Sequence, residues 1–392
     1  MKKILGLVLE LNPIHNGHYY FLKEAQRRVE PELTIVVISG NYTMRGDVSV
    51  LDKFTKTRLA LASGVDLVME LPFSSAVNSA DYFGYNAIKI LTSMQITDLA
   101  FGVELDKPEK LIRMKEIIDQ EEFQEEIKKE LKKGLSYPTS AYRALQKLSD
   151  DEEIINHFSL PNNTLGIQYL RALDELGVDI RIELIKRIAN NYYDKNLTGN
   201  ISSATAIREL LLKGEEIYSY VPDLGLKPQY LNQIEAEKRL LLLLKYLFTL
   251  KFPEDFRSLW GVNEGIEMRI AGFIDKSTDY QNLIRNIQTK RYPQNKIKRL
   301  LLHILLNTKK NFENQKLSYL RVLGSNQKGL KYIRKLPKDI KSEIITTFKN
   351  QENILIQSEL KATKLYGLLS DRPELIMEEY KIPIITGGKN DN

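Results

Sequence analysis

Two of the four histidines in this 392-residue chain, His15 and His18, stand three positions apart with Gly17 between them. Imidazoles at this spacing could donate hydrogen bonds to phosphate oxygens and stabilise the charge that develops when a phosphorus centre is attacked. Gly17 has no Cβ, so a phosphate could approach the backbone closely. The pattern predicts a phosphate-directed active site. The alternative is a pair of histidines that caps a helix or faces solvent.

The residues around this pair predict the elements that present it. An apolar run of strand length begins at Ile4, Asn12-Pro13 forms a tight turn, and a helix is expected from about His18 to Arg28. The N-terminus of a helix directs free N–H groups and the positive end of the helix dipole at a ligand. A strand–turn–helix is also the context that a phosphate-binding motif requires.

A second helix N-terminus carries further hydrogen-bond donors. Ser202 and Ser203 precede an apolar helical stretch, which is an N-cap signature. An ordinary cap is one interpretation. The other is a second group of phosphate ligands, namely the hydroxyls of Ser203 and Thr205 and the guanidinium of Arg208.

The first half of the chain alternates between apolar strands and helical patterns. Further strands are expected at 33–39, 66–72, 98–104 and 181–188, and helices at about 52–63, 78–91 and 163–176. This alternation predicts an α/β fold with a Rossmann-like, doubly wound parallel sheet, which binds ligands beyond the carboxyl ends of its strands. Gly40, Gly102 and the His15–His18 turn all fall at those ends.

Composition limits the class of protein. The chain is 43% hydrophobic and 28% charged, which is typical of a globular protein. It has no cysteine, which excludes disulfides and thiolate metal sites and fits a reducing compartment. The N-terminus lacks the features of a signal peptide, and no apolar run approaches the length of a membrane span. We therefore expect a soluble, cytoplasmic protein that has no membrane partner.

Charge divides the chain into two parts. Residues 1–220 have a net charge of −5 and residues 221–392 a net charge of +11, and the stretch 281–340 holds 15 basic and 2 acidic residues. This asymmetry predicts small-molecule chemistry on a domain over 1–215 and a nucleic-acid surface on a mainly α-helical, basic domain over 216–392. Helices are expected at 234–250, 281–287, 294–306 and 339–348.

The basic residues around the helix at 294–306 are the candidates for nucleic-acid contact. They crowd a region with almost no acidic neighbours, and the alternative is a solvated helix face. The candidates are Lys290, Arg291, Lys296, Lys298 and Arg299.

Two motifs together indicate a superfamily. Residues 15–18 resemble the HxGH signature of nucleotidylyltransferases, and residues 202–208 resemble their ISSTxIR signature. The similarity extends further, and the chain resembles the bacterial tRNA(Met) cytidine acetate ligase family over most of its length. The stretches that carry this resemblance are 10–18, 39–41 with 45–46, 66–72, 161–163 with 165–166, 186–188, 203–208, 289–292 and 322–324.

The resemblance implies an enzyme that activates acetate with ATP and acetylates the wobble cytidine of elongator methionine tRNA. His15, His18 and Arg208 would be catalytic, and Mg²⁺ would bridge the phosphates of ATP. No side-chain metal site and no obligate protein partner are expected. The residues assigned to ATP are Leu7, Val8, Leu9, Glu10, Leu11, Asn12, Pro13, Ile14, His15, Asn16, Gly17, His18, Tyr19, Tyr20, Gly102, Asn162, Arg187 and Ile188, with Ser203 and Thr205 added from the second motif.

Some alternatives stay open at this point. The pattern alone does not separate Asn162 from Asn163 as the nucleotide contact. The chain could also be an adenylyltransferase that acts on a small phosphorylated metabolite, or a non-catalytic RNA-binding protein that senses a nucleotide. The basic second half argues against the first of these, and two intact phosphate motifs argue against the second.

Overall fold

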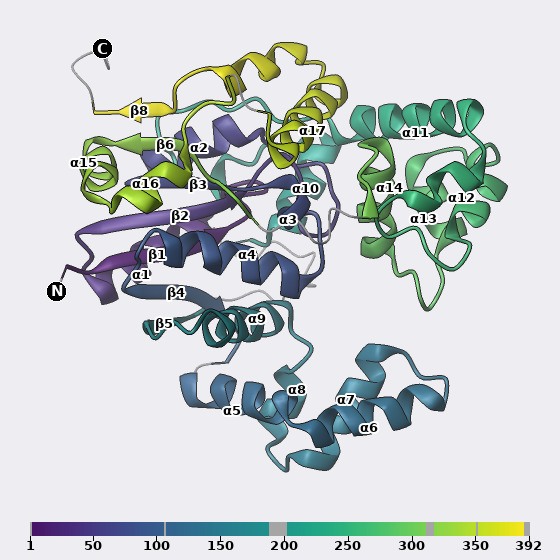
Figure 1. Cartoon of the computed structure of the whole chain (residues 1–392), viewed down its shortest axis with the longest axis horizontal. Coiled ribbons are helices and arrows are strands. Elements are labelled where there is room, and N and C mark those ends of the chain that lie inside the picture. Colours follow the sequence, from purple (N-terminus) through teal and green to yellow (C-terminus); the bar gives the residue numbers. More distant parts are fainter. Residues whose placement is uncertain (1, 106, 188–201, 311–316, 350–351, 388–392) are drawn as a thin grey trace. The chain divides into compact units, whose positions relative to one another are not determined.

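The computed structural model describes residues 2–105, 107–187, 202–310, 317–349 and 352–387 (Figure 1). The chain forms two compact units. The first unit comprises residues 1–7, 20–34 and 79–189, and the second comprises 8–19, 35–78 and 190–392. Both units draw on distant parts of the sequence, so neither follows the boundary that charge suggested near residue 215.

The first unit is organised around β4 (Asp98–Val103). This strand pairs in parallel with β1 (Ile4–Leu9) on one side and with β5 (Arg181–Lys186) on the other. In the register, Leu5 lies opposite Asp98 and Phe101 opposite Leu184. The structure thus confirms the parallel arrangement expected for these strands, with ends that differ by one or two residues.

Helices complete the first unit. α4 (Ala80–Ser93) packs against α9 (Pro161–Leu176). The helices that follow β4 and precede α9 in the sequence lie together in Figure 1. Most of α1 (Asn16–Val29) also belongs to this unit. The helices between β4 and α9 are α5 (Pro108–Asp119), α6 (Glu121–Lys132), α7 (Tyr137–Leu148) and α8 (Glu152–His157).

The second unit has strands from both halves of the chain. β2 (Leu33–Ser39) pairs in parallel with β3 (Leu67–Leu71), as expected. On its other side β3 pairs antiparallel with β6 (Leu320–Asn326), which in turn pairs in parallel with β7 (Ile344–Ile345) and β8 (Ile384–Thr386). The sequence analysis predicted neither β6 nor β8. The second half of the chain therefore adds strands as well as helices.

In the sequence, α2 (Lys53–Ala62) follows β2, and α3 (Phe73–Ala76) follows β3. In the second half, α11 to α14 pack on one another, and α17 packs against α11 and α3. The helices of this half are α10 (Ala204–Lys213), α11 (Gln233–Leu250), α12 (Ile266–Ile274), α13 (Tyr280–Ile287), α14 (Gln294–Leu305), α15 (Gln327–Lys335), α16 (Lys338–Glu343) and α17 (Ile354–Ser370), with 3₁₀ helices η1 (Tyr218–Tyr220), η2 (Pro253–Ser258) and η4 (Pro373–Tyr380).

One predicted helix is wrong in part. The stretch 339–348 is helical only as far as Glu343, and Ile344–Ile345 then forms β7. Ile344 pairs with Leu320 of β6. β-Branched residues favour a pleated, half-buried strand once a partner strand is present, and that partner is a tertiary feature.

A buried ion cluster joins the C-terminal helices to the sheet of the second unit. The Lys53 ammonium on α2 lies 2.5 Å from Glu70, 3.1 Å from Glu359 and 2.6 Å from Glu379. Burial lowers the pKa of Lys53, but the three carboxylates outweigh burial and raise it. Because these charges are buried, removal of one partner would leave the others uncompensated. The cluster fixes α17 and η4 against α2 and β3.

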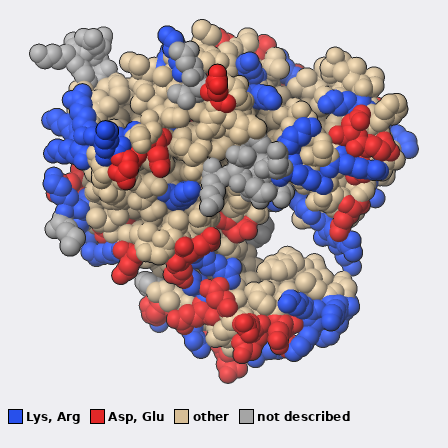
Figure 2. Space-filling model, viewed as in Figure 1, with Lys and Arg blue, Asp and Glu red and all other residues tan. Residues whose placement is uncertain are grey.

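Charged side chains are intermixed on the surface. On the face seen in Figure 2, basic and acidic side chains alternate over the helices α11 to α14, and basic side chains gather over α15 and α16. In the described parts of the chain, no helix combines the length and the apolar character that a bilayer crossing needs.

Candidate functional site

The strand–turn–helix around His15 has the form that the sequence predicts. β1 ends at Leu9, and α1 begins at Asn16. The Nδ1 atom of His15 accepts hydrogen bonds from the backbone N–H groups of Gly17 at 3.0 Å and His18 at 3.3 Å. His15 therefore caps the helix with Nδ1, and its neutral ring carries the hydrogen on Nε2. The capping and phosphate-binding interpretations are compatible, because they use different ring nitrogens.

His18 lies beside His15. The two ring centroids are 3.8 Å apart, with an angle of 34° between the ring planes. His15 is only 3% exposed, whereas His18 is half-buried. The side chains of Leu7, Leu11, Asn12 and Ile14 are also buried. These four residues can therefore meet a nucleotide chiefly through main-chain groups.

Arg208 on α10 reaches the same turn. Its Nη1 donates to the backbone oxygen of Asn12 at 2.7 Å, and its Nη2 donates to Thr205 Oγ1 at 3.1 Å. Asn12 is fixed in turn, because its side-chain oxygen accepts from Ser49 Oγ and from Val50 N. The structure thus brings the second motif to the turn that precedes the first, through a contact between residues 196 positions apart. A guanidinium has five N–H donors, so Arg208 keeps others for an anion.

The two serines at the start of α10 differ in their hydrogen bonds. Ser203 Oγ accepts from Ala206 N, so Ser203 is the N-cap of the helix. Ser202 was not among the predicted ligands, yet its hydroxyl is buried and has no hydrogen-bond partner among the residues that the structure describes. Its only sequence signal was its place in the motif.

Two ionisable side chains with shifted pKa values lie next to the turn. Glu10 is half-buried, its Oε1 accepts from Met44 N at 2.7 Å, and burial raises the pKa of this carboxyl. Lys56 is fully buried, and its Nζ donates to the backbone oxygens of Ser39 and Gly40. Burial lowers the pKa of Lys56 to about 7, with Glu10 acting in the opposite direction. Glu10 thereby ties the end of β1 to the loop 41–48.

The first unit holds a second group of predicted ATP ligands. A Cβ built on Gly102 of β4 would lie 3.4 Å from Arg187 Cγ, and Arg187 Nη1 donates to Asn162 Oδ1 at 3.0 Å. The amide nitrogen of the Asn162 side chain donates to Glu104. Gly102, Asn162 and Arg187 are therefore neighbours. Ile188, the remaining predicted ligand of this group, lies outside the described residues.

Glu104 organises this group, although no sequence motif singled it out. Its second carboxylate oxygen accepts from Asn163 N at 3.0 Å, and Asn163 Oδ1 accepts from Glu104 N at 2.9 Å. Asn163 is fully buried, whereas Asn162 is half-buried and Arg187 is exposed. Asn162 is thus the residue of the pair with surface available to a ligand.

The predicted nucleic-acid contacts divide by exposure. Lys290, Arg291 and Lys296 are exposed, and Arg291 forms an ion pair with Glu264. Lys298 and Arg299 are half-buried. Lys298 forms an ion pair with Asp47 at 2.7 Å, and Arg299 donates to Met44 O at 3.1 Å. The last two residues therefore hold the loop 41–48 against α14.

The sequence analysis did not recognise that a second group of basic residues forms a separate surface. The charge excess over 281–340 combines the region around α14 with α15 and α16, which pack beside β6 (Figure 1). Summing charge over a window of sequence cannot separate surfaces that the fold places apart. The exposed cations of the second group are Lys328, Lys331, Arg334, Lys335, Lys338 and Lys341.

A metal site built from side chains is not evident in the described ranges. There, no three histidine, aspartate or glutamate side chains gather in a way that could hold an ion.

Comparisons with known proteins show the family and the fold to which the chain is similar. Residues 1–379 match the family described as HIGH Nucleotidyl Transferase. The tRNA(Met) cytidine acetate ligase of Staphylococcus haemolyticus is 32% identical over 390 residues, covering 99% of this chain and all of the relative. The crystal structure of Thermotoga maritima TmcAL without ligand has a TM-score of 0.87 at 30% identity, covering 98% of this chain and 99% of the other. The same protein bound with alpha-thio ATP gives a TM-score of 0.84 at 28% identity and the same coverage.

Proposed function

The chain belongs to the HIGH nucleotidyl transferase family and, within it, to the tRNA(Met) cytidine acetate ligases, and from this premise we propose how its residues carry out the reaction. The protein forms acetyl-adenylate from acetate and ATP and transfers the acetyl group to the wobble cytidine of elongator tRNA(Met). The observation that carries the proposal is the hydrogen bond from Arg208 to Asn12, because it gathers both phosphate motifs at one turn.

The first step is an attack by acetate on the α-phosphorus of ATP. A new bond forms between a carboxylate oxygen and the phosphorus, and the bond to the β-bridging oxygen breaks, so pyrophosphate leaves. Both reactants are anions, so the site must neutralise charge and align them. The N-terminus of α1 directs the positive end of a helix dipole at the phosphates.

The two histidines and Arg208 have separate tasks in this step. His15 uses Nδ1 to cap α1, so it is the other ring nitrogen, Nε2, that donates to a phosphate oxygen when ATP is bound. His18 packs on the His15 ring and acts on the α- and β-phosphates together with it. Arg208 holds the leaving pyrophosphate through N–H groups that Asn12 and Thr205 do not use.

In the second step the N4 amine of the cytidine attacks the acetyl carbonyl carbon. The C–O bond to the phosphate breaks, AMP leaves with the electron pair, and the amine loses a proton, which yields N4-acetylcytidine. An anticodon loop is single-stranded, so its base can be presented without melting a duplex. Lys290, Arg291 and Lys296 are the residues best exposed to meet RNA phosphates.

A Mg²⁺ ion would be held by the phosphates of ATP and would neutralise part of their charge, because this ion is usually bound through substrate phosphates and one or two carboxylates. A tRNA substrate and the absence of cysteine both fit a reaction in the cytoplasm.

The test is a mass analysis of tRNA nucleosides after incubation of the protein with tRNA, ATP and isotope-labelled acetate. We expect labelled N4-acetylcytidine together with AMP and pyrophosphate. A parallel reaction replaces acetate and ATP with acetyl-CoA. Product formed from acetyl-CoA without ATP would overturn the adenylate mechanism, and failure to label any nucleoside with acetate would overturn the proposed function.

A further inference from the structure

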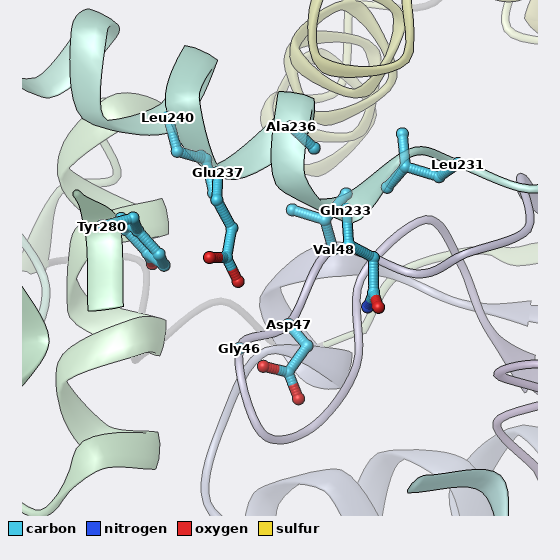
Figure 3. A pocket seen from close by; sticks show the side chains of 9 residues that line it. All are labelled: Gly46, Asp47, Val48, Leu231, Gln233, Ala236, Glu237, Leu240 and Tyr280. Carbon is cyan, nitrogen blue, oxygen red and sulfur yellow. The ribbon is translucent and has the colours of Figure 1, made fainter. Parts of the chain in front are cut away.

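A pocket on the second unit has not entered the reaction so far. It is a partly open hollow between the loop 41–48, α11 and α13, and its space of about 330 Å³ includes some of the open solvent at its mouth (Figure 3). The lining residues are Gly46, Asp47, Val48, Leu231, Gln233, Ala236, Glu237, Leu240 and Tyr280.

One polar group in this pocket lacks a partner. Tyr280 is only 4% exposed, and its hydroxyl has no hydrogen-bond partner among the described residues. A buried hydroxyl that makes no hydrogen bond costs stability, so such a group needs an explanation. Figure 3 shows the side chains of Tyr280 and Glu237 pointing into the same space. Burial raises the pKa of Tyr280, so its hydroxyl stays protonated and can donate.

The carboxylates beside Tyr280 are acceptors. Glu237 Oε1 accepts from the side chain of Gln281 at 2.6 Å, and Oε2 makes no hydrogen bond with any residue that the structure describes. Asp47 is neutralised by Lys298 at 2.7 Å. A phosphate would be repelled by Glu237, whereas an amino group would be attracted to it.

Apart from the amide of Gln233, the remaining walls are apolar. Val48, Leu231, Ala236 and Leu240 provide flat, non-hydrogen-bonding surface. A ligand that fits has apolar ring faces and, on one edge, an amino donor next to a ring-nitrogen acceptor. Cytosine and adenine have such an edge, with N4 beside N3 and N6 beside N1. Uracil and guanine present a carbonyl oxygen in place of the amine, which would face the carboxylate of Glu237.

We propose that this pocket takes one unpaired cytosine or adenine base of the tRNA, with Glu237 accepting from the exocyclic amine and Tyr280 donating to the adjacent ring nitrogen. Unpaired RNA bases are commonly turned outward and recognised on their edges in this way. This inference rests on the proposed function, since it assumes an RNA substrate. The base held here is not the acetylated cytidine, because an amine bound to Glu237 is not free to attack acetyl-adenylate.

The loop 41–48 links the pocket to Glu10, five residues before His15. Glu10, at the end of β1, accepts from Met44 N, and Asp47 follows three residues later in the same loop. Three residues span at most about 11 Å. Gly46 lies directly on α14, where a Cβ would be 2.5 Å from Arg299 N, so the loop cannot move away without losing this contact.

The experiment combines protein and RNA changes. Binding is measured for the wild type and for Tyr280→Phe against tRNA transcripts in which each unpaired cytosine of the anticodon loop is replaced by uracil and each unpaired adenine by purine, which lacks only the amine. We expect one position at which the wild type loses about 5- to 150-fold in affinity while Tyr280→Phe loses much less. For Glu237→Gln, the position at which a change of base alters the affinity should be the same one.

Tyr319→Phe is the matched control. Tyr319 is also buried with an unpartnered hydroxyl in the described part of the chain, but it does not line the pocket. It should keep the wild-type dependence on every base. Equal behaviour of Tyr280→Phe and the wild type, or a uniform loss for all RNAs, would overturn the inference. Acetylation of tRNA by the wild type is scored separately, so a failed pocket and a failed function give different results.

Discussion

The turn around His15 and the basic residues around α14 belong to the same unit but hold their polar groups in different ways. His15 is 3% exposed and is fixed by two backbone hydrogen bonds, whereas the Arg291 side chain is 77% exposed and has one exposed carboxylate beside it. The turn is also closed by Arg208, which comes from the far end of the first half of the chain.

This difference separates two kinds of binding. A group that is already fixed can stabilise a transition state without reorganisation, so one residue can account for a large rate factor. Exposed, mobile cations share their energy among many weak contacts, each of which is screened by salt. We therefore expect large effects on catalysis from single changes in the turn and small, salt-dependent effects on tRNA binding from single changes around α14.

The largest effect is expected from His18→Ala. Acetyl-adenylate formation, followed as acetate-dependent exchange of labelled pyrophosphate into ATP, should fall about 10²- to 10³-fold, the usual result of removing one transition-state donor. Binding of tRNA should not change, because His18 packs on the ring of His15 and is not one of the cations assigned to RNA contact.

His157→Gln is the control for this variant, since His157 lies on α8 of the first unit. It should exchange pyrophosphate at the wild-type rate. Full activity of His18→Ala would remove this residue from the mechanism, and loss of tRNA binding in that variant would remove the contrast between the two regions.

The next effect concerns Lys290, Arg291 and Lys296, replaced together by alanine. The plot of log affinity for tRNA against log salt should become shallower by about one unit or less for each lost phosphate contact. Acetyl-adenylate formation without tRNA should stay the same. Filter binding across a salt titration measures the first quantity and pyrophosphate exchange the second.

A double variant of Lys298 and Arg299 sharpens this test. These residues are half-buried and contact Asp47 and Met44, so their replacement should change the salt slope less than the triple variant does. Wild-type affinity of the triple variant at all salt concentrations would identify the α14 strip as a solvated face. The cations of α15 and α16 would then be the next surface to change.

The smallest expected effect is on the pH dependence of stability, and it contrasts the buried face of α14 with its exposed face. His303 is buried on the inner face, with Nε2 donating to Val77 O at 2.9 Å and its ring stacked on Trp260. Burial lowers the pKa of His303 to about 4. Between about pH 6.5 and 4 the unfolded chain binds the extra proton, so the free energy of unfolding should fall as pH falls, by at most about 1.4 kcal/mol per pH unit.

Denaturant unfolding at pH 7.0, 6.0 and 5.0 measures this slope. His303→Gln keeps a donor for Val77 but cannot titrate, so its slope should be smaller than that of the wild type. Equal slopes for the two proteins would show that other groups cause the loss of stability. Replacement of the exposed Lys296 on α14 should leave the slope unaltered, whereas loss of Arg299, whose charge also lowers the pKa of His303, should reduce it.

Much of the site could be predicted because its signals are local. The run before His15, the turn at Asn12-Pro13 and the serines before α10 each specify an element within about a dozen residues. Glu104 and Ser202 were missed for the opposite reason. Glu104 acts through α9, some 58 residues further along the chain, and the state of the Ser202 hydroxyl depends on burial. Neither property leaves a pattern in the neighbouring sequence.

The sequence by itself determined the parallel strands, the two phosphate motifs and the family, because hydrophobic period, caps and turns are properties of short segments. Only the tertiary structure decided which segments meet. It joined Arg208 to Asn12, paired Lys298 with Asp47 across 251 positions, and returned β6 to the edge of β3. It also split one basic stretch into two surfaces. These contacts depend on packing and on the burial of charge, which no local window of sequence records.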